Sequence, residues 1–366
     1  MPDSRRPAGD DAAVPAAIHR PRRASRGLTL RWLTPAICRQ IVGAPFPIAC
    51  GVIIVAGLAL LIDDSGIMPT PRSLLFPIDF APLAWATFTL AVLSVFLHEV
   101  GHVAAARSAG FPASIRISNR LYVLVVETDM SGIWLVPKRQ RYVAFMIGSI
   151  IDAASASFVV AFLWLTRHGW IHPPRWMALL ASAMLLAYGT RLVWQWFFFL
   201  RTDGYYVIAT AFGCKSLLSD TEAFLQNLVR RLLRRTGRID QSRVPAREMR
   251  VVRVYAGLWI IGRCIALSVY FGVGLPILWG YFYQFLLLIT GQHSRFGTID
   301  FVTIVVLAYL TDVTGFVLWL RSLYRRAAAA FRARAARQRA AAPQGQLALD
   351  TAHLITVDMD AIAEEA

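Results

Sequence analysis

The chain has few charged residues and few cysteines, and each shortage excludes a class of protein. Asp, Glu, Lys and Arg make up only 16% of the 366 residues, whereas 57% are hydrophobic, and the mean hydropathy is +0.51. A soluble domain does not need so much apolar material for its core, so the composition predicts a membrane protein. The four cysteines, Cys38, Cys50, Cys214 and Cys264, lack the paired spacing of disulfide frameworks and zinc knuckles, and we expect them to be packing residues.

Long apolar runs determine the expected architecture. Six runs have about the 20 residues that a helix needs to cross a bilayer, at 46–62, 83–106, 143–165, 176–200, 254–273 and 301–320. A seventh stretch, 274–290, contains Pro276, and we expect it to be re-entrant or interfacial, with a full span as the alternative. The sequence therefore predicts an all-α polytopic membrane protein of about six transmembrane helices, with a core at 46–322 between two tails, 1–45 and 323–366.

Basic residues are concentrated in alternate connections between these runs. Segments 1–45, 107–142, 213–253 and 321–366 carry eight, six, ten and seven Lys or Arg residues, whereas the three intervening loops carry one, two and one. The positive-inside rule then places both termini and the two long loops in the cytoplasm. The formal charge of +16 is thus a topology signal, and we expect no nucleic-acid partner and no cleaved signal peptide.

The second apolar run ends in the sequence HEVGH, which contains three ionisable side chains. His98 and His102 are four residues apart and share one face of a helix, so both can reach one metal ion. Glu99 lies beside them, where it can activate a water bound to zinc, as in HExxH zinc peptidases. Ionisable groups in a spanning helix are costly and usually functional, which favours this interpretation over simple hydrogen bonding to neighbouring helices.

A third metal ligand is expected from the fourth apolar run. Apolar character continues from residue 176 to Phe212, too far for one straight helix across a bilayer, and Asp203-Gly204 is the expected break. Broken helices at membrane depth line cavities, so Asp203 is the candidate ligand. The alternative is an ordinary Asp-Gly pair at a helix end.

Together these residues resemble the site-2 protease family of intramembrane zinc metallopeptidases. The resemblance implies Zn²⁺ bound by His98, His102 and Asp203, with Glu99 as the catalytic acid and base. The segment that contains Asp203 reads DGYY (203–206), and this form resembles a bacterial branch of the family, the peptide zinc metalloproteases. Members of that branch are often linked with peptide maturation or export. This implies a multi-pass protein of the bacterial inner membrane that cleaves a membrane-embedded or membrane-associated peptide, with a transporter or maturation protein as a further partner.

Further residues could position the substrate. The family's Gly-Pro and Asn element is represented here by Gly148, Ser149 and Asp152. Four charged residues, Asp152, Arg191, Arg263 and Asp312, lie at similar depth in their spans, roughly 12–14 Å from the cytoplasmic end. Structural ion pairs are the simpler explanation, and contact of Asp152 or Arg191 with the substrate or the developing oxyanion is the alternative.

The segment 113–130 is predicted to form a short cytoplasmic β-hairpin with a turn at Ser118-Asn119. An edge strand beside HExxH could hold an extended substrate by strand addition, although a purely structural hairpin explains the pattern equally well.

Two other functions remain open. The chain could be a non-catalytic membrane component of a peptide maturation or export complex, with an idle metal site. A di-iron oxidoreductase is a more distant alternative, since His168 and His172 are also four residues apart, as in the paired His motifs that such enzymes use. The chain has only seven histidines, which are too few to supply the ligands of a di-iron site of that kind.

Overall fold

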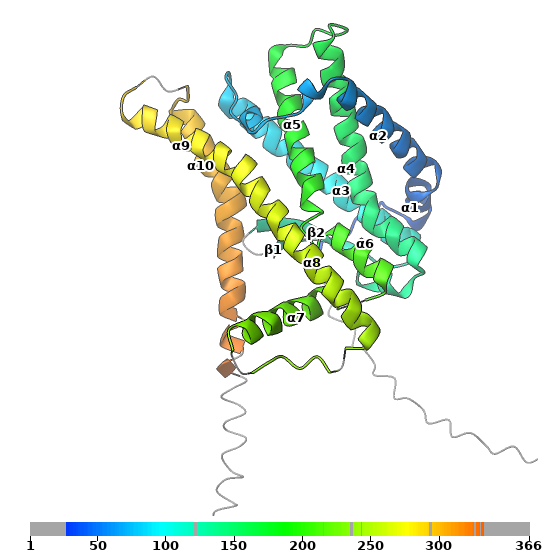
Figure 1. The fold of residues 1–366 in the computed structure, drawn as a ribbon. Helices are drawn as coiled ribbons and strands as arrows, with labels where there is room; N and C mark the ends of the chain where they lie inside the picture. Colours follow the sequence, from blue (N-terminus) through cyan, green and yellow to red (C-terminus); the bar gives the residue numbers. More distant parts are fainter. Residues whose placement is uncertain are drawn as a thin grey trace, which may run out of the picture.

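A computed structural model of the chain describes residues 27–120, 123–214, 216–234, 237–242, 244–292, 295–325, 327–329 and 331–332, without the side chains of 119, 120, 123, 131 and 312. Within these residues the protein is a bundle of helices with one small antiparallel sheet (Figure 1). The tail segments 1–26 and 333–366 lie outside the described residues.

Six helical segments are long and apolar enough to cross a membrane, as the sequence predicts for a multi-pass membrane protein. They are Pro35–Asp63, Phe80–Ser108, Lys138–Arg167, Arg175–Trp194, Ala246–Ile289 and Thr298–Ala329. The first comprises α1 (Pro35–Val42) and α2 (Pro45–Asp63), and the next three are α3 (Phe80–Ser108), α4 (Lys138–Arg167) and α5 (Arg175–Trp194). The fifth comprises α8 (Ala246–Val269), η4 (Tyr270–Gly274) and α9 (Leu275–Ile289), and the sixth contains α10 (Thr298–Ala308) and η5 (Tyr309–Val313).

Helix α4 is the centre of the bundle. Half of its most apolar stretch is buried inside the protein, against 22% or less in the other five spans, and it contacts α2, α3, α5 and the short helix α6 (Asp203–Phe212). Its middle contains small residues, including Gly148, Ala154 and Ser157, that let neighbouring helices approach closely. Because α4 touches α3 and α6 at once, it can bring residues from both into one site.

The apolar stretch 274–290 does not form a separate helix, and its predicted re-entrant or interfacial position in the membrane stays a prediction. It continues α8 as one helical segment of 44 residues, Ala246–Ile289. Pro276 cannot donate a hydrogen bond, and the chain widens just before it into the π-helical turn η4, where the N–H of Leu275 bonds to the carbonyl of Tyr270. A helix of this length measures about 66 Å, roughly twice the thickness of a hydrocarbon core, so part of it lies outside the membrane core or it tilts strongly.

Part of the region assigned to the N-terminal tail is packed against the bundle. Leu30, Leu33 and Cys38 are buried against Val103 and its neighbours on α3. The guanidinium of Arg107 donates to the backbone carbonyls of Leu30 and Leu33, with an Nη1–O distance of 2.8 Å to Leu33. These contacts make residues 28–42 part of the folded core.

The predicted β-hairpin is confirmed, but Ser118-Asn119 is not its turn. Strand β1 (Ser114–Arg120) pairs antiparallel with β2 (Val123–Asp129), and Ser118 and Asn119 are strand residues opposite Val125 and Leu124. The alternation of apolar and polar residues ends at Ser118, but pairing with β2 keeps the backbone extended through Asn119. On its other side β1 forms a bridge with Leu28.

Two glycines of α2 provide a test of the bundle packing. An added Cβ at Gly57 would lie 2.4 Å from the Cβ of Ser157 on α4, whereas a Cβ at Gly51 meets nothing within 4 Å. Both changes to Ala bring the same gain in helix propensity, so their difference isolates packing. We expect Gly57→Ala to be less stable than Gly51→Ala by about 1–3 kcal/mol, measured by thermal unfolding in detergent. Equal unfolding midpoints would contradict the α2–α4 packing.

Candidate metal centre

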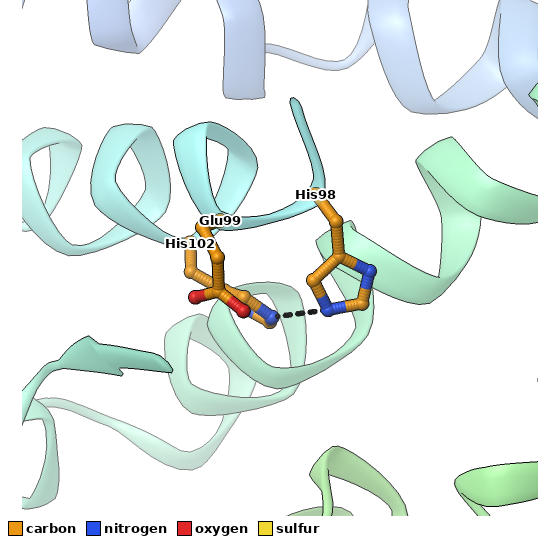
Figure 2. A group of neighbouring side chains, drawn as sticks. All are labelled: His98, Glu99 and His102. Carbon is orange, nitrogen blue, oxygen red and sulfur yellow. Dashed lines mark hydrogen bonds between the residues drawn. The ribbon is translucent and has the colours of Figure 1, made fainter. Parts of the chain in front are cut away.

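The last three turns of α3 carry the HEVGH residues into the interior of the bundle. His98, Glu99 and His102 are all buried, with exposed fractions of 6%, 6% and 2%. Figure 2 shows both imidazoles directed toward the same space, with Glu99 beside them. Ligand atoms from the three residues lie within 4.8 Å of one another. The i to i+4 spacing thus places both histidines on one face, as the sequence predicts.

Asp203 reaches the same space from the start of α6. Between α5 and α6 the chain is non-helical at 195–202, so the predicted break at Asp203-Gly204 was wrong in position. Thr202 caps α6 by accepting a hydrogen bond from the N–H of Tyr205 at 3.4 Å, and the N–H of Asp203 donates to Oε1 of Gln195 at 3.0 Å. Gly204 lies inside the helix, and its missing side chain admits the carbonyl of Gln195, which would be 2.4 Å from an added Cβ.

The irregular segment 195–202 has its own stabilising contacts. Phe197, Phe198 and Phe199 are buried, and the hydroxyl of Tyr255 on α8 donates to the carbonyl of Phe198 at 2.7 Å. Gly262, also on α8, lets the backbone at Phe198 approach closely. Non-helical backbone inside a membrane protein requires such partners, so α8 fixes the break that presents Asp203.

Three donor atoms of His98, His102 and Asp203 form a nearly equilateral triangle. The Nε2 atoms of the two histidines are 3.0 Å apart, and Oδ2 of Asp203 lies 3.2 Å from Nε2 of His98 and 3.3 Å from Nε2 of His102. Donor atoms that share a tetrahedral zinc ion are about 3.3 Å apart, given bonds of about 2.0–2.1 Å. The triangle therefore has the size that a zinc site requires.

The hydrogen bonds at the far side of each imidazole determine which nitrogen is free. Nδ1 of His102 is 2.7 Å from the carbonyl of Ala144, and Nδ1 of His98 is 2.8 Å from Oδ2 of Asp152. Both partners are acceptors, so each Nδ1 carries a proton, and in a neutral imidazole Nε2 then presents a lone pair. Two lone pairs and a carboxylate oxygen facing one another repel unless a cation lies between them. The residues thus fit a divalent metal ion, and nitrogen and oxygen donors in this number suit Zn²⁺.

Asp152 connects His98 to the partly buried guanidinium of Arg191. Arg191 on α5 donates to Asp152 from Nε at 2.8 Å and from Nη2 at 2.7 Å, and Nη1 donates to Oγ of Ser94 at 3.0 Å. Asp152 itself is 1% exposed. The expected ion pair between Asp152 and Arg191 is therefore present, and it orients a histidine of the site. A role of either residue in substrate contact remains a prediction.

Arg263 and Asp312, the other two charged residues expected at the depth of Asp152 and Arg191, form no described ion pair with them. Arg263 is exposed and its guanidinium lies over the rings of Phe199 and Trp259, at 4.5 and 4.8 Å from their centroids. The side chain of Asp312 lies outside the described residues, so its pairing stays a prediction. His168, of the second histidine pair, stacks on Trp164 and has Nδ1 2.9 Å from the carbonyl of that residue, which is an ordinary helix-end contact.

Gly148 of α4 leaves room for the donor triangle. A Cβ at this position would lie 2.5 Å from Nε2 of His98 and 2.6 Å from Nε2 of His102. Any side chain here would occupy the space on which the donors converge. The lack of a side chain at Gly148 thus keeps the space between the donor atoms open, and its predicted role in substrate positioning stays a prediction.

The carboxylate of Glu99 is held by the hairpin. Thr128 of β2 donates from Oγ1 to Oε2 of Glu99 at 2.7 Å and also lies 3.2 Å from the carbonyl oxygen of Glu99. Thr128, Gln195 and Thr202 are site residues that sequence reasoning missed. Thr202 has a local signal, because Thr directly before Asp-Gly is a good N-cap, whereas Thr128 and Gln195 depend on tertiary contacts.

Removing the space at Gly148 tests the geometry of the site. We expect Gly148→Ala to weaken Zn²⁺ binding by more than the roughly 10–100-fold typical of outer-shell changes, because the methyl group collides with both donor nitrogens. The matched control is Gly189→Ala on α5, where an added Cβ meets nothing within 4 Å. Competition with a zinc chelator measures both affinities, and equal affinities would rule out the donor arrangement.

Changing Asp152→Asn tests the orienting role of its carboxylate. We expect Zn²⁺ affinity to fall about 10–100-fold, since the amide cannot both accept from His98 and neutralise Arg191. The control is the same change at Asp64, which pairs with Arg167 at 2.7 Å in an exposed ion pair near the end of α2. Wild-type affinity in the Asp152 variant would show that His98 needs no such partner.

Comparison with other proteins adds no assignment. Neither protein-family models, nor curated proteins, nor solved structures give a match to this chain. The function proposed below therefore depends on the side chains and distances of the site itself.

Proposed function

We propose that the protein is an intramembrane zinc metallopeptidase of the site-2 protease type, which hydrolyses a peptide bond of a membrane-associated protein or precursor peptide. The observation that carries the proposal is the convergence of Nε2 of His98, Nε2 of His102 and Oδ2 of Asp203 at 3.0–3.3 Å, next to Glu99. Two histidines and a carboxylate are a donor set of catalytic zinc sites, which keep one position open.

The proposed chemistry divides between the metal and Glu99. A zinc ion held by the three donors would lower the pKa of water and polarise the scissile carbonyl. Glu99 is the general base: it takes a proton from the attacking water and returns it to the leaving amine. Thr128 occupies Oε2 of Glu99, so Oε1 is the oxygen that we assign to this proton transfer. Asp152 and Arg191 hold the ring of His98 in the tautomer that directs Nε2 inward.

The hairpin offers a surface for an extended substrate. Backbone hydrogen bonds join Leu28 to Ile115, at 2.8 and 3.0 Å, so this part of the β1 edge is occupied. The other edge of the hairpin belongs to β2, which also carries Thr128 beside Glu99. A peptide added to β2 as a further strand would thus run close to the general base and to η5, which also contacts β2.

We propose the bacterial inner membrane as the location, with both termini and the hairpin in the cytoplasm. The support is the distribution of basic residues over alternate connections. The site then opens toward the cytoplasmic half of the bilayer, and a substrate would be a membrane-anchored protein or a precursor peptide.

Substitution of Glu99 tests the proposed activity. Wild-type protein is co-expressed with a small precursor peptide or a membrane-anchored regulator encoded beside its gene, and cleavage is followed by mass spectrometry. We expect Glu99→Gln to reduce the cleavage rate roughly 10²–10⁴-fold, because the amide cannot accept the proton, while the zinc content remains unchanged. Glu222→Gln is the matched control, since Glu222 is exposed and lies outside the residues of the proposed site.

Two outcomes would contradict the proposal. Equal cleavage by wild type and Glu99→Gln would show that a different enzyme cuts the substrate. A metal-free wild-type protein that co-purifies with transporter subunits would instead support a non-catalytic role in peptide maturation or export.

A further inference from the structure

Helix α7 (Leu217–Leu232) is amphipathic along its whole length, but only its first half is packed against the protein. Leu217 and Leu218 are buried in a cluster with Tyr205 of α6 and with Val252 and Tyr255 of α8. The N–H of Leu218 also donates to the hydroxyl of Tyr205 at 3.4 Å. The first half of α7 is thus anchored to the folded core.

The same apolar stripe continues past these contacts without a protein partner in the described residues. Leu228, Val229, Leu232 and Leu233 are 51%, 52%, 82% and 56% exposed. On a helical wheel they extend the stripe that begins at Leu217 and Leu218. A run of four exposed large apolar residues on one face requires an apolar medium or an apolar partner.

The opposite face of this half-helix is positively charged. Arg231 is exposed, as is Arg234, which follows the end of the helix in left-handed backbone, and Arg230 is partly exposed and donates to the carbonyl of Gly237. Leucine on one face and arginine on the other is the pattern of helices that lie in the surface of an anionic membrane.

The depth of α7 agrees with this environment. It packs on α8 at Met249, Val252 and Tyr255, which alternate along the helix with the exposed Arg250 and Arg253 and precede the apolar run. This is the point at which the span changes from charged to apolar, which is the level of the lipid headgroups. Figure 1 shows α7 lying crosswise to α10 below the bundle, as a helix in the membrane surface would.

We propose that the C-terminal half of α7 is an interfacial helix that inserts Leu228, Val229, Leu232 and Leu233 into an anionic leaflet, with Arg231 and Arg234 on the lipid phosphates. This contact is independent of the proposed catalytic function. It attaches the folded core to the membrane surface at the helix that packs against α6, the element that carries Asp203.

Site-directed spin labelling of the full chain tests the proposal. A nitroxide is placed at Leu232→Cys or, as the control on the exposed polar face, at Gln226→Cys, in a Cys264→Ser background that removes the exposed native cysteine. The protein is reconstituted in phosphatidylcholine with or without phosphatidylglycerol, and collisions with oxygen and with a water-soluble nickel complex are measured. We expect collisions with oxygen to be the more frequent at position 232 and collisions with the nickel complex at position 226. The difference between the two positions should be larger when phosphatidylglycerol is present.

A double substitution tests the contribution of the arginines to membrane contact. We expect Arg231→Gln with Arg234→Gln to abolish the difference between the two lipid mixtures at position 232. Equal nickel access at 232 and 226 would place the apolar face in water and overturn the proposal. Low collision rates with both reagents at position 232 would show that protein covers the apolar face, and would overturn the proposal. If oxygen dominates at 232 equally in both lipid mixtures without the arginine substitutions, the role of the arginines is overturned.

Discussion

Two imidazole nitrogens and one carboxylate oxygen, all acceptors when both rings are neutral, face one another at 3.0–3.3 Å in the interior of the bundle. This arrangement is unfavourable without a cation, and much of the surrounding structure serves to maintain it. Ala144 and Asp152 fix the Nδ1 sides of the two imidazoles, and Gly148 keeps the space between the donors open. The break before α6 exists at a cost in backbone hydrogen bonding and brings the third donor to the other two.

The ion pair next to His98 is explained by the cost of burying a charge. Asp152 and Arg191 are an ion pair inside an apolar bundle, where removing either partner would leave an uncompensated charge. Each member also has a further partner, His98 for the carboxylate and Ser94 for the guanidinium. Such a pair contributes little to stability compared with apolar packing, and its value lies in holding one ring in one orientation.

Much of this could be predicted from the sequence, because the strongest signals are local. Apolar run length gives the spans, and the i to i+4 spacing gives the shared face of His98 and His102. The pairing of Asp203 with a motif a hundred residues earlier could also be expected, since an overlong apolar run has to break. The exact position of the break could not be predicted, because it depends on Gln195, on buried Phe198 and on Tyr255 of another helix. The same holds for Thr128, whose contact with Glu99 depends on how the hairpin docks on α3.

The central claim is that the three donors hold one zinc ion. X-ray absorption at the zinc edge of the purified full-length protein, reconstituted with one equivalent of Zn²⁺, measures the donors directly. The account predicts two imidazoles and oxygen donors at about 2.0–2.2 Å, with four ligands in total. A spectrum with sulfur donors, or with six oxygen ligands and no imidazole, would contradict it.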